Sequence, residues 1–268
     1  PTQRTADGDI KELKWEEAMM ILRDEFSKVT GDEIAGLVGR FADIESICAF
    51  RDLMHRLGCE TIENSSIAPK VNVNLRPEYL FNSRITGVED CDYLLFIGCN
   101  PKTEAPVLNA RIRQCVEDEG LEVGVLGYPA EFNYKYDHIG TSPKTLQEIA
   151  DGTHPICEKL KSCELPMIVT SSAVLAREDG EAILNNLKKI AEDTNVINKE
   201  SAWNGMNILH NEVGRVSACD LGVPQYRGKD GIKDAKLVYL LGADDFREED
   251  IPEHAFVVYQ GHTGDKGA

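Results

Sequence analysis

Residues 92–126 read D-Y-L-L-F-I-G-C-N-P-K-T-E-A-P-V-L-N-A-R-I-R-Q-C-V-E-D-E-G-L-E-V-G-V-L, and this stretch decides the fold. The unbroken apolar run at 93–97 predicts a buried strand. Leu108, Ile112 and Cys115 then recur at helical spacing, and a second apolar run closes the stretch. A strand, a helix and a strand in this order predict a parallel pair joined by a crossover helix.

The same theme recurs along the chain and predicts an α/β protein built of parallel-sheet, Rossmann-like lobes. Further strands are expected at 33–38, 166–170, 237–241 and 255–259, and helices at 15–29, 43–57, 183–190 and 203–216. The stretches 59–77 and 128–162 show no clear period and are expected to be irregular. We therefore predict an extended lead-in at 1–14, a first lobe at 15–162 and a second lobe at 163–268, truncated at its C-terminal end.

Composition excludes several kinds of partner and site. The net charge of −17 would repel a phosphate backbone, so no nucleic-acid partner is expected. No apolar run approaches the roughly 20 residues that span a bilayer, so no direct membrane insertion is expected. The eight cysteines form no C-x-x-C, which favours buried reduced thiols over metal ligands.

Small flexible loops follow the predicted strands, which is the layout of a nucleotide pocket in an open parallel sheet. These loops are Gly98-Cys99-Asn100-Pro101, Gly127-Tyr128-Pro129, Ser171-Ser172, Gly242-Ala243-Asp244-Asp245 and Gly261-His262-Thr263-Gly264. The phosphate-binding fingerprints G-x-G-x-x-G after a strand and G-x-x-x-x-G-K-[ST] are absent from the sequence. The Gly-rich run 261–267 has no helix after it. Because sharp turns need glycine for steric reasons alone, we favour a structural interpretation of these loops.

The sequence also lacks a catalytic constellation. Ser171-Ser172 has no flanking glycines of a nucleophile elbow, and Asp244-Asp245 begins an acidic turn that is expected to be solvated. The six histidines, His55, His138, His154, His210, His254 and His262, are scattered and form no H-E-x-x-H motif. We therefore predict no catalytic, no cofactor-binding and no metal-binding residue in this chain.

Several motifs carry a specific resemblance to a known family. Residues 92–113 resemble the signature of the largest iron–sulfur subunit of the peripheral arm of mitochondrial NADH:ubiquinone oxidoreductase (complex I) and its bacterial counterpart, a strand followed by G-x-N-P-R-x-E-A-P-x-x-N-A-R-I-R. Lys102 stands where that signature has Arg. Further matches, in the family's order, are Y-K-Y-D-H-I-G at 134–140, S-P-K-T-L at 142–146, M-N-I-L-H at 206–210, L-L-G-A-D at 240–244 and Y-Q-G-H at 259–262.

This resemblance implies the molybdopterin oxidoreductase fold of the formate dehydrogenase and DMSO reductase type, in which a molybdenum–pterin guanine dinucleotide lies between α/β lobes. In those enzymes Cys, selenocysteine or Ser ligates the metal from a loop that matches 64–69 here. That stretch reads N-S-S-I-A-P without a Cys, and Cys59 lies upstream. Where molybdenum enzymes commonly have Asp-Pro, the chain has Gly127-Tyr128-Pro129. Both departures imply a lobe that kept the fold and lost the cofactor.

The function that the resemblance implies is that of a structural domain supporting NADH-to-quinone electron transfer without its own active site. It implies 4Fe-4S and 2Fe-2S clusters in an N-terminal part of the full subunit, and no cofactor in this segment. It also implies other peripheral-arm subunits as partners, the flavoprotein and iron–sulfur subunits, and a place on the matrix side of the mitochondrial inner membrane. Two alternatives stay open: a cofactor-binding fragment of an active molybdopterin oxidoreductase, and a free-standing nucleotide-binding protein.

Overall fold

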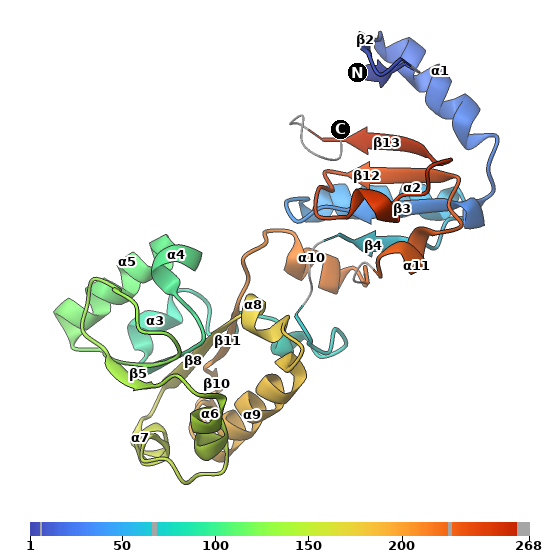
Figure 1. The fold of residues 1–268 in the computed structure, drawn as a ribbon. Helices are drawn as coiled ribbons and strands as arrows, with labels where there is room; N and C mark the ends of the chain where they lie inside the picture. Colours follow the sequence, from blue (N-terminus) through green and yellow to red (C-terminus); the bar gives the residue numbers. More distant parts are fainter. Residues whose placement is uncertain (6, 66–68, 225–226, 262–268) are drawn as a thin grey trace. The chain divides into compact units, whose positions relative to one another are not determined.

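The computed structural model describes residues 1–5, 7–65, 69–224 and 227–261. The chain forms two α/β units. Residues 1–67 and 213–268 make up the first, here called the split unit because it is built from both ends of the chain. Residues 68–212 make up the second, the continuous unit. Each unit has its own sheet and its own core (Figure 1).

The split unit has a four-stranded parallel sheet in the order β13-β12-β3-β4. Its strands are β3 (Ile34–Val38), β4 (Ile62–Asn64), β12 (Leu237–Leu241) and β13 (Phe256–Gln260), and its helices are α1 (Trp15–Phe26), α2 (Ile44–Arg56), α10 (Arg215–Asp220) and α11 (Lys229–Ile232), with 3-10 turns at Gly31–Glu33 and Glu248–Asp250. An antiparallel hairpin of β1 (Thr2–Arg4) and β2 (Ile10–Glu12) precedes α1. Alternate residues of β3 face α2 and α11 on opposite sides, so the sheet is covered on both faces.

The continuous unit has a five-stranded parallel sheet in the order β11-β8-β5-β6-β7. The strands are β5 (Tyr93–Ile97), β6 (Glu122–Leu126), β7 (Asp137–Gly140), β8 (Pro166–Ser171) and β11 (Met206–Leu209). The helices are α3 (Gly87–Asp90), α4 (Pro101–Glu104), α5 (Pro106–Gln114), α6 (Pro143–Ala150), α7 (Ile156–Ser162), α8 (Ser172–Leu175) and α9 (Gly180–Asp193). A 3-10 turn lies at Arg76–Glu78, a π-helical turn at Cys115–Glu119, and a small pair of strands at Ile197–Asn198 and Trp203–Asn204.

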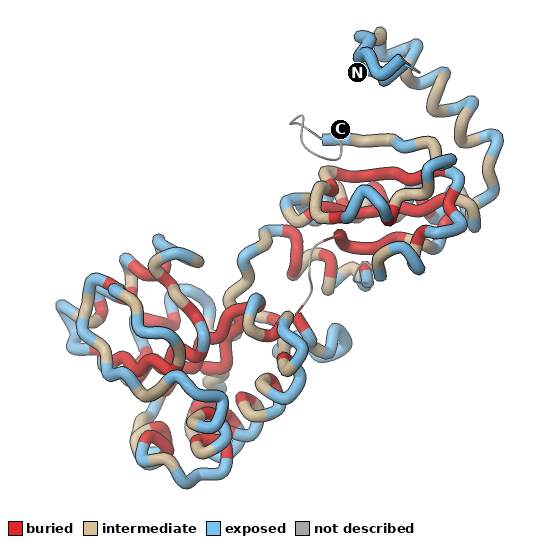
Figure 2. Tube along the Cα trace, in the orientation of Figure 1, coloured by how far each residue is buried: buried red, intermediate tan, exposed pale blue. Residues whose placement is uncertain are grey.

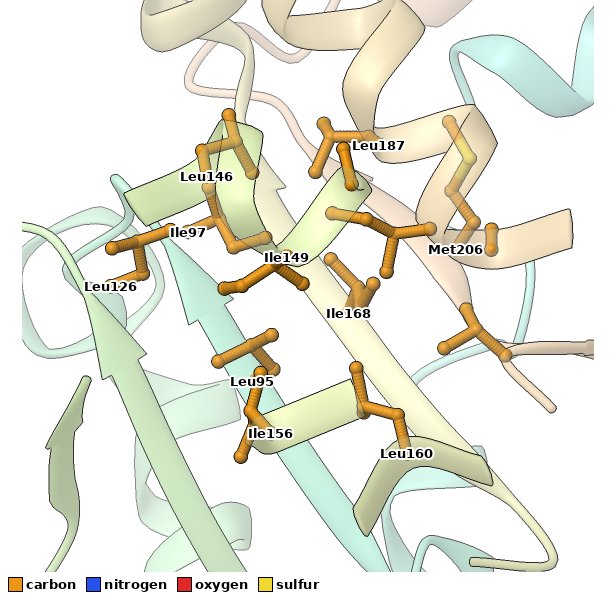
Figure 3. Packing of buried hydrophobic residues seen from close by; sticks show 14 of the residues in the cluster. Leu95, Ile97, Leu126, Leu146, Ile149, Ile156, Leu160, Ile168, Leu187 and Met206 are labelled. Carbon is orange, nitrogen blue, oxygen red and sulfur yellow. The ribbon is translucent and has the colours of Figure 1, made fainter. Parts of the chain in front are cut away.

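The core of the continuous unit follows from the two-residue period of β5, whose side chains alternate between the faces of the sheet. Leu95 packs with side chains of α6, α7 and α9, a cluster that Figure 3 shows with Leu146, Ile149 and Leu187 around Ile168. Phe96 packs on the other face with α5 and the 130–136 segment. The buried residues run along the strands in Figure 2, which places the core between sheet and helices.

The two units differ from the contiguous lobes, 15–162 and 163–268, that the sequence predicts. β8, expected in the second lobe, pairs with β5, and β12 pairs with β3 from the start of the chain. The irregular-looking stretch 128–162 therefore lies inside the continuous unit and contains β7, α6 and α7. Apolar patterns identify strands but not their hydrogen-bonded neighbours, so sequence order alone misplaced the boundary. The expected lead-in, 1–14, forms the β1–β2 hairpin.

The structure confirms one of the predicted helices discussed next and contradicts another. The helix predicted at 43–57 is confirmed as α2, and Asp43 caps it by accepting a hydrogen bond from the Ser46 N–H at 2.8 Å. The predicted helix at 203–216 is wrong: β11 occupies 206–209, and a helix begins only at Arg215. The stretch 59–77 contains β4, a strand too short for a clear alternating pattern. Among the described residues, no helix combines the length and apolar character needed to cross a membrane.

Candidate functional site at the carboxyl ends of the strands

The sheet of the continuous unit has a topological switch point between β5 and β8. The chain passes from β5 to β6 and β7 on one side, and then to β8 and β11 on the other. In open parallel sheets, ligands bind in the crevice outside the carboxyl ends of the strands at such a point. The loops after Ile97 and Ser171 therefore line the position where a nucleotide would be expected.

A side chain fills this position. Gly98 follows β5 with φ of +59°, a conformation that favours glycine. A Cβ built on Gly98 would lie 2.7 Å from Cγ2 of Val174, which is in α8. Val174 therefore packs directly on the Gly98 backbone. The Gly98 turn, which could have cradled a phosphate, is occupied by an aliphatic side chain.

The polar groups beside Val174 are also engaged within the protein. Thr170 donates its hydroxyl hydrogen to the Ile97 carbonyl at 2.9 Å, which ties β8 to the end of β5. Ser171 Oγ accepts a hydrogen bond from the Ala173 N–H at 3.2 Å and so caps α8. Thr170 and Ser171 are both buried. Their hydroxyls thus serve the strand end and the helix start, which fits the structural interpretation of Ser171-Ser172.

The signature motif after β5 builds a rigid turn. Asn100 caps α4, because its Oδ1 accepts a hydrogen bond from the Lys102 N–H at 3.1 Å. Glu104 Oε1 accepts from the Asn100 N–H at 2.6 Å, which closes the turn from the other side. Lys102 Nζ donates to Asn133 Oδ1 at 3.0 Å. Pro101 and Pro106 occupy first-turn positions of α4 and α5, where their missing N–H groups cost nothing.

The asparagine of the motif, Asn109, links α5 to the segment that follows β6. Its side-chain NH₂ donates to the Phe132 carbonyl at 3.2 Å, and its Oδ1 accepts from the Tyr134 hydroxyl at 2.9 Å. Burial raises the pKa of Tyr134, so the phenol stays protonated and able to donate. Asn109 is itself buried. The motifs at 92–113 and 134–140 are therefore in contact in the folded chain, because each supplies one residue of this hydrogen bond.

Cys99 lies in the same turn and behaves as a core residue. Burial, and then the charge of Glu104, raise the pKa of its thiol, so the group is neutral at physiological pH. Its side chain belongs to the cluster that packs on Phe96. A protonated buried thiol is neither a nucleophile nor a metal ligand.

The split unit has its own switch point between β3 and β12, and it too is filled. A Cβ on Gly39 would lie 1.7 Å from the Gly242 carbonyl oxygen, so the two strand ends touch through their backbones. Arg40 then pairs with Asp245 across the same point, with Nε to Oδ2 at 2.7 Å and Nη2 to Oδ1 at 2.8 Å. This two-pronged ion pair gives Asp245 a structural partner. The turn that begins at Asp244-Asp245, which we expected to be solvated, therefore uses Asp245 to connect the ends of β12 and β3.

The remaining candidate residues do not gather into a site. Within the described ranges, no group of three or more His, Cys, Asp or Glu residues is placed to hold a metal ion. Asn64 and Ser65, which begin the stretch 64–69, are buried at the end of β4, whereas residues 66–68 lie outside the described residues. The Gly-rich run is described only at Gly261, and residues 262–268, including His262, lie outside the described part. Cys59 is a buried thiol that donates to the Ile34 carbonyl at 3.0 Å.

Comparison with known proteins identifies the family. The sequence profile described as molybdopterin oxidoreductase matches residues 1–268. The chain belongs to the molybdopterin oxidoreductase family. This membership agrees with the parallel α/β units and confirms the fold that the motifs predicted.

Within this family, the chain is similar to subunits of NADH dehydrogenases. It is 39% identical over 269 aligned residues to the NADH dehydrogenase [ubiquinone] iron-sulfur protein 1 of Solanum tuberosum, covering 100% of this chain and 36% of that protein. It is 35% identical to a subunit of the NADH-quinone oxidoreductase of Rickettsia bellii, covering 98% and 38%. It is 36% identical to the 78 kDa subunit of NADH-ubiquinone oxidoreductase of Neurospora crassa, covering 98% and 36%. The chain thus spans little more than a third of the length of these relatives, and the resemblance stated from its motifs is confirmed.

Sequence reasoning missed two features of the strand ends in this molybdopterin oxidoreductase domain. Arg40 and Asp245 are 205 positions apart, and no local pattern connects them. Val174 stands out in no motif, yet it covers Gly98. Both contacts depend on which strands are neighbours, so only the tertiary structure reveals them.

Proposed function

We propose that this chain is a structural domain of the large iron–sulfur subunit of NADH:ubiquinone oxidoreductase, supporting NADH-to-quinone electron transfer without an active site of its own. The observation that carries the proposal is the filling of both switch points by the protein itself. Val174 packs on Gly98 in the continuous unit, and the Arg40–Asp245 pair bridges Gly39 and Gly242 in the split unit. Whole-chain similarity to complex I subunits supports it independently.

The described strand ends do not fit the guanine dinucleotide that the family implies. A phosphate group needs free N–H donors and room for its oxygens at a glycine turn. At Gly98 the room is taken by Val174, and the Ala173 N–H in the first turn of α8 already donates to the Ser171 hydroxyl. At Gly39 the backbone of Gly242 leaves no space for even one added carbon. We therefore assign no cofactor, no metal and no catalytic residue to this segment.

The wider setting follows from the relatives. We propose that the full subunit carries 4Fe-4S and 2Fe-2S clusters outside this segment, because the potato relative is named an iron-sulfur protein. We propose flavoprotein and iron–sulfur subunits of the peripheral arm as partners, on the matrix side of the mitochondrial inner membrane. The domain's role is then mechanical: two rigid α/β units hold neighbouring electron carriers in place.

The test is made on the full-length subunit in its native assembly. We expect recovery, by affinity tag and native gel, in a large complex with NADH dehydrogenase activity, and metal analysis showing iron without stoichiometric molybdenum. Stoichiometric molybdenum, or a pterin released on denaturation, would overturn the proposal. Recovery as a solitary chain that binds NAD tightly would overturn it in favour of a free-standing nucleotide-binding protein.

One observation favours the alternative, a cofactor-binding fragment of an active molybdopterin oxidoreductase. The Ser65 hydroxyl is buried at the end of β4 without a hydrogen-bond partner in the described part of the chain. It lies in the stretch that resembles the metal-ligand loop of the molybdenum enzymes. Such a buried, unsatisfied hydroxyl carries a desolvation cost that a ligand would remove. The metal analysis above separates the two functions.

A further inference from the structure

The sheet of the split unit has an outer side at β13 with unused hydrogen-bonding groups. Phe256 donates its N–H to the Lys236 carbonyl, and the Gln260 carbonyl accepts from the Gly242 N–H, both at 2.8 Å. Because the polar groups of successive residues alternate between the two sides of a strand, the N–H and C=O of Val257 face away from β12. Among the described residues, no strand pairs with β13 on that side. We call this side of β13 the open edge.

The sequence of β13 is that of an interior strand. It reads F-V-V-Y-Q and, like β3 and β12, contains no charged residue and no proline. All residues of β3 and β12 are buried, whereas none of β13 is. Strands of parallel sheets are apolar throughout because they are normally covered on both faces. The composition of β13 therefore fits a strand with a neighbour on each side.

The other edges of the two large sheets are covered or protected. At the edge of β4, the Asn64 N–H donates to the Pro224 carbonyl at 2.7 Å, and Phe81 forms an antiparallel bridge to β11. β7 is short, begins with the exposed Asp137 and His138, and has an irregular register with β6. Charge and irregularity discourage the pairing of an edge with further strands. β13 has neither, since its register with β12 is regular over its whole length.

The α1 helix carries apolar surface past the open edge. Trp15, Met19, Leu22 and Phe26 share one stripe of this helix. Phe26 stacks on Tyr239 of β12 with ring centroids 6.4 Å apart, whereas Trp15 is 66% and Met19 54% exposed. In Figure 1 the N-terminal half of α1 extends past β13, on the side away from β12. The helix rises about 16 Å from Trp15 to Phe26, and neighbouring strands lie about 4.8 Å apart, so its exposed end is long enough to cover a further strand.

Charge and chain length distinguish between the possible occupants of this surface. A second copy of the chain is disfavoured, because each copy carries a net charge of −17 and the two would repel. The chain spans 36% of the potato relative and 38% of the Rickettsia bellii relative. On the proposed function, most of the subunit therefore lies outside these 268 residues. A strand added in parallel is ordinarily reached by a crossover within one polypeptide, which favours the subunit itself as its source.

We propose that a strand from the part of the full-length subunit outside residues 1–268 pairs in parallel with β13 along the open edge, and that its side chains cover Trp15 and Met19. The inference rests on the proposed function, since it takes the chain to be one part of a longer subunit. The added strand supplies partners for the N–H and C=O of Val257 and makes β13 an interior strand. It also gives the exposed end of α1 a surface to pack on.

Hydrogen exchange at Val257, in the full-length subunit within its native assembly, tests the pairing. The Val258 N–H faces β12 and serves as the internal reference. We expect the two amides to exchange at rates within about tenfold of each other, because both donate inside a sheet. A Val257 amide that exchanges more than about tenfold faster than that of Val258 overturns the proposal.

Met19 and Met20 offer a matched pair of substitutions. They are 54% and 52% exposed, but only Met19 lies on the stripe of α1. Met19→Lys places a charge against the added strand, so recovery of the soluble full-length subunit should fall at least about threefold below that of Met20→Lys. Equal recovery of the two variants overturns the proposal, because it would mean that nothing covers Met19.

The source of the strand is identified with a photo-cross-linking residue at position 257 of the full-length subunit, where the side chain is 42% exposed. Adducts with a segment of the same subunit outside residues 1–268 support the proposal. Adducts confined to residues 1–268, to a second copy or to another subunit overturn it. If the subunit is found in no assembly, the proposed function fails, while exchange and cross-linking on the isolated full-length subunit still decide whether a strand covers the open edge.

Discussion

Replacing Gly98 with alanine tests whether the strand end of β5 is filled as described. The residue has φ of +59°, and a Cβ there costs about 1–2 kcal/mol in the left-handed region. The new Cβ would also lie 2.7 Å from Val174 Cγ2, and overpacking of this kind costs about 1–3 kcal/mol. The Gly98→Ala variant should therefore lose about 2–5 kcal/mol of unfolding free energy.

A double-mutant cycle separates the two contributions. Val174→Ala removes both γ carbons and leaves only Val174 Cβ near the new methyl group, at 3.7 Å. The double variant should then be less destabilised than the sum of the single variants by about 1–3 kcal/mol, while the backbone strain remains. This coupling is the signature of direct contact between the two side chains.

The assay is urea unfolding followed by tryptophan fluorescence in a Trp15→Phe background. The chain has two tryptophans, and Trp15 belongs to the split unit, so Trp203 then reports the continuous unit alone. Trp15 is 66% exposed, which makes the background substitution mild. Changes in unfolding free energy that add to within about 0.5 kcal/mol would refute contact between Val174 and Gly98. An unchanged midpoint for Gly98→Ala would refute the strained turn as well.

Three further predictions concern other contacts. Arg40→Ala and Asp245→Ala should each destabilise the split unit by no more than about 1 kcal/mol, because the pair is partly exposed; a coupling energy that does not decline at about 0.5 M salt would contradict this. Gly124→Ala should destabilise by about 1–3 kcal/mol, since its Cβ would lie 2.2 Å from the Tyr93 hydroxyl oxygen. Adding Tyr93→Phe to the Gly124→Ala variant should recover part of its lost stability. Tyr93→Phe alone should be neutral or stabilising, because this buried hydroxyl has no partner in the described part of the chain. A large loss of stability in Tyr93→Phe alone would contradict this explanation. Burial raises the pKa of the Cys91 and Cys99 thiols, so above about pH 8.5 these cysteines ionise first in the unfolded chain, and the free energy of unfolding should fall as pH rises. The urea midpoints at pH 7 and pH 10 should therefore differ less in C91A/C99A than in the parent chain. An equal difference in both proteins would show that the buried thiols do not cause the pH dependence.

The expected α1 helix shows how far sequence patterns reach. Trp15, Ala18, Leu22, Phe26 and Val29 have helical spacing, and the helix exists at Trp15–Phe26. However, none of its residues is buried, and only Phe26 and Val29 pack on the core of the split unit. Spacing predicts which side chains share a face, but it does not determine what that face contacts. Leu53 of α2 has helical spacing with the buried Ile47 and Phe50, yet it is 41% exposed.

The sequence by itself determined the main buried strands and the family, but not every local element, since the helix predicted at 203–216 is wrong. Apolar runs predicted β3, β5 and β12, whose residues are all buried, because a strand covered on both faces is apolar throughout. The same pattern predicted β13, although none of its residues is buried. The motifs at 92–113 and 134–140 identified the relatives, and in the structure a hydrogen bond between Tyr134 and Asn109 joins the two motifs. The division into a split and a continuous unit was decided only by the tertiary structure, as were Val174 on Gly98 and the Arg40–Asp245 bridge. The physical reason is that pairing between distant strands places these residues together, and a one-dimensional pattern carries no record of which strands are neighbours.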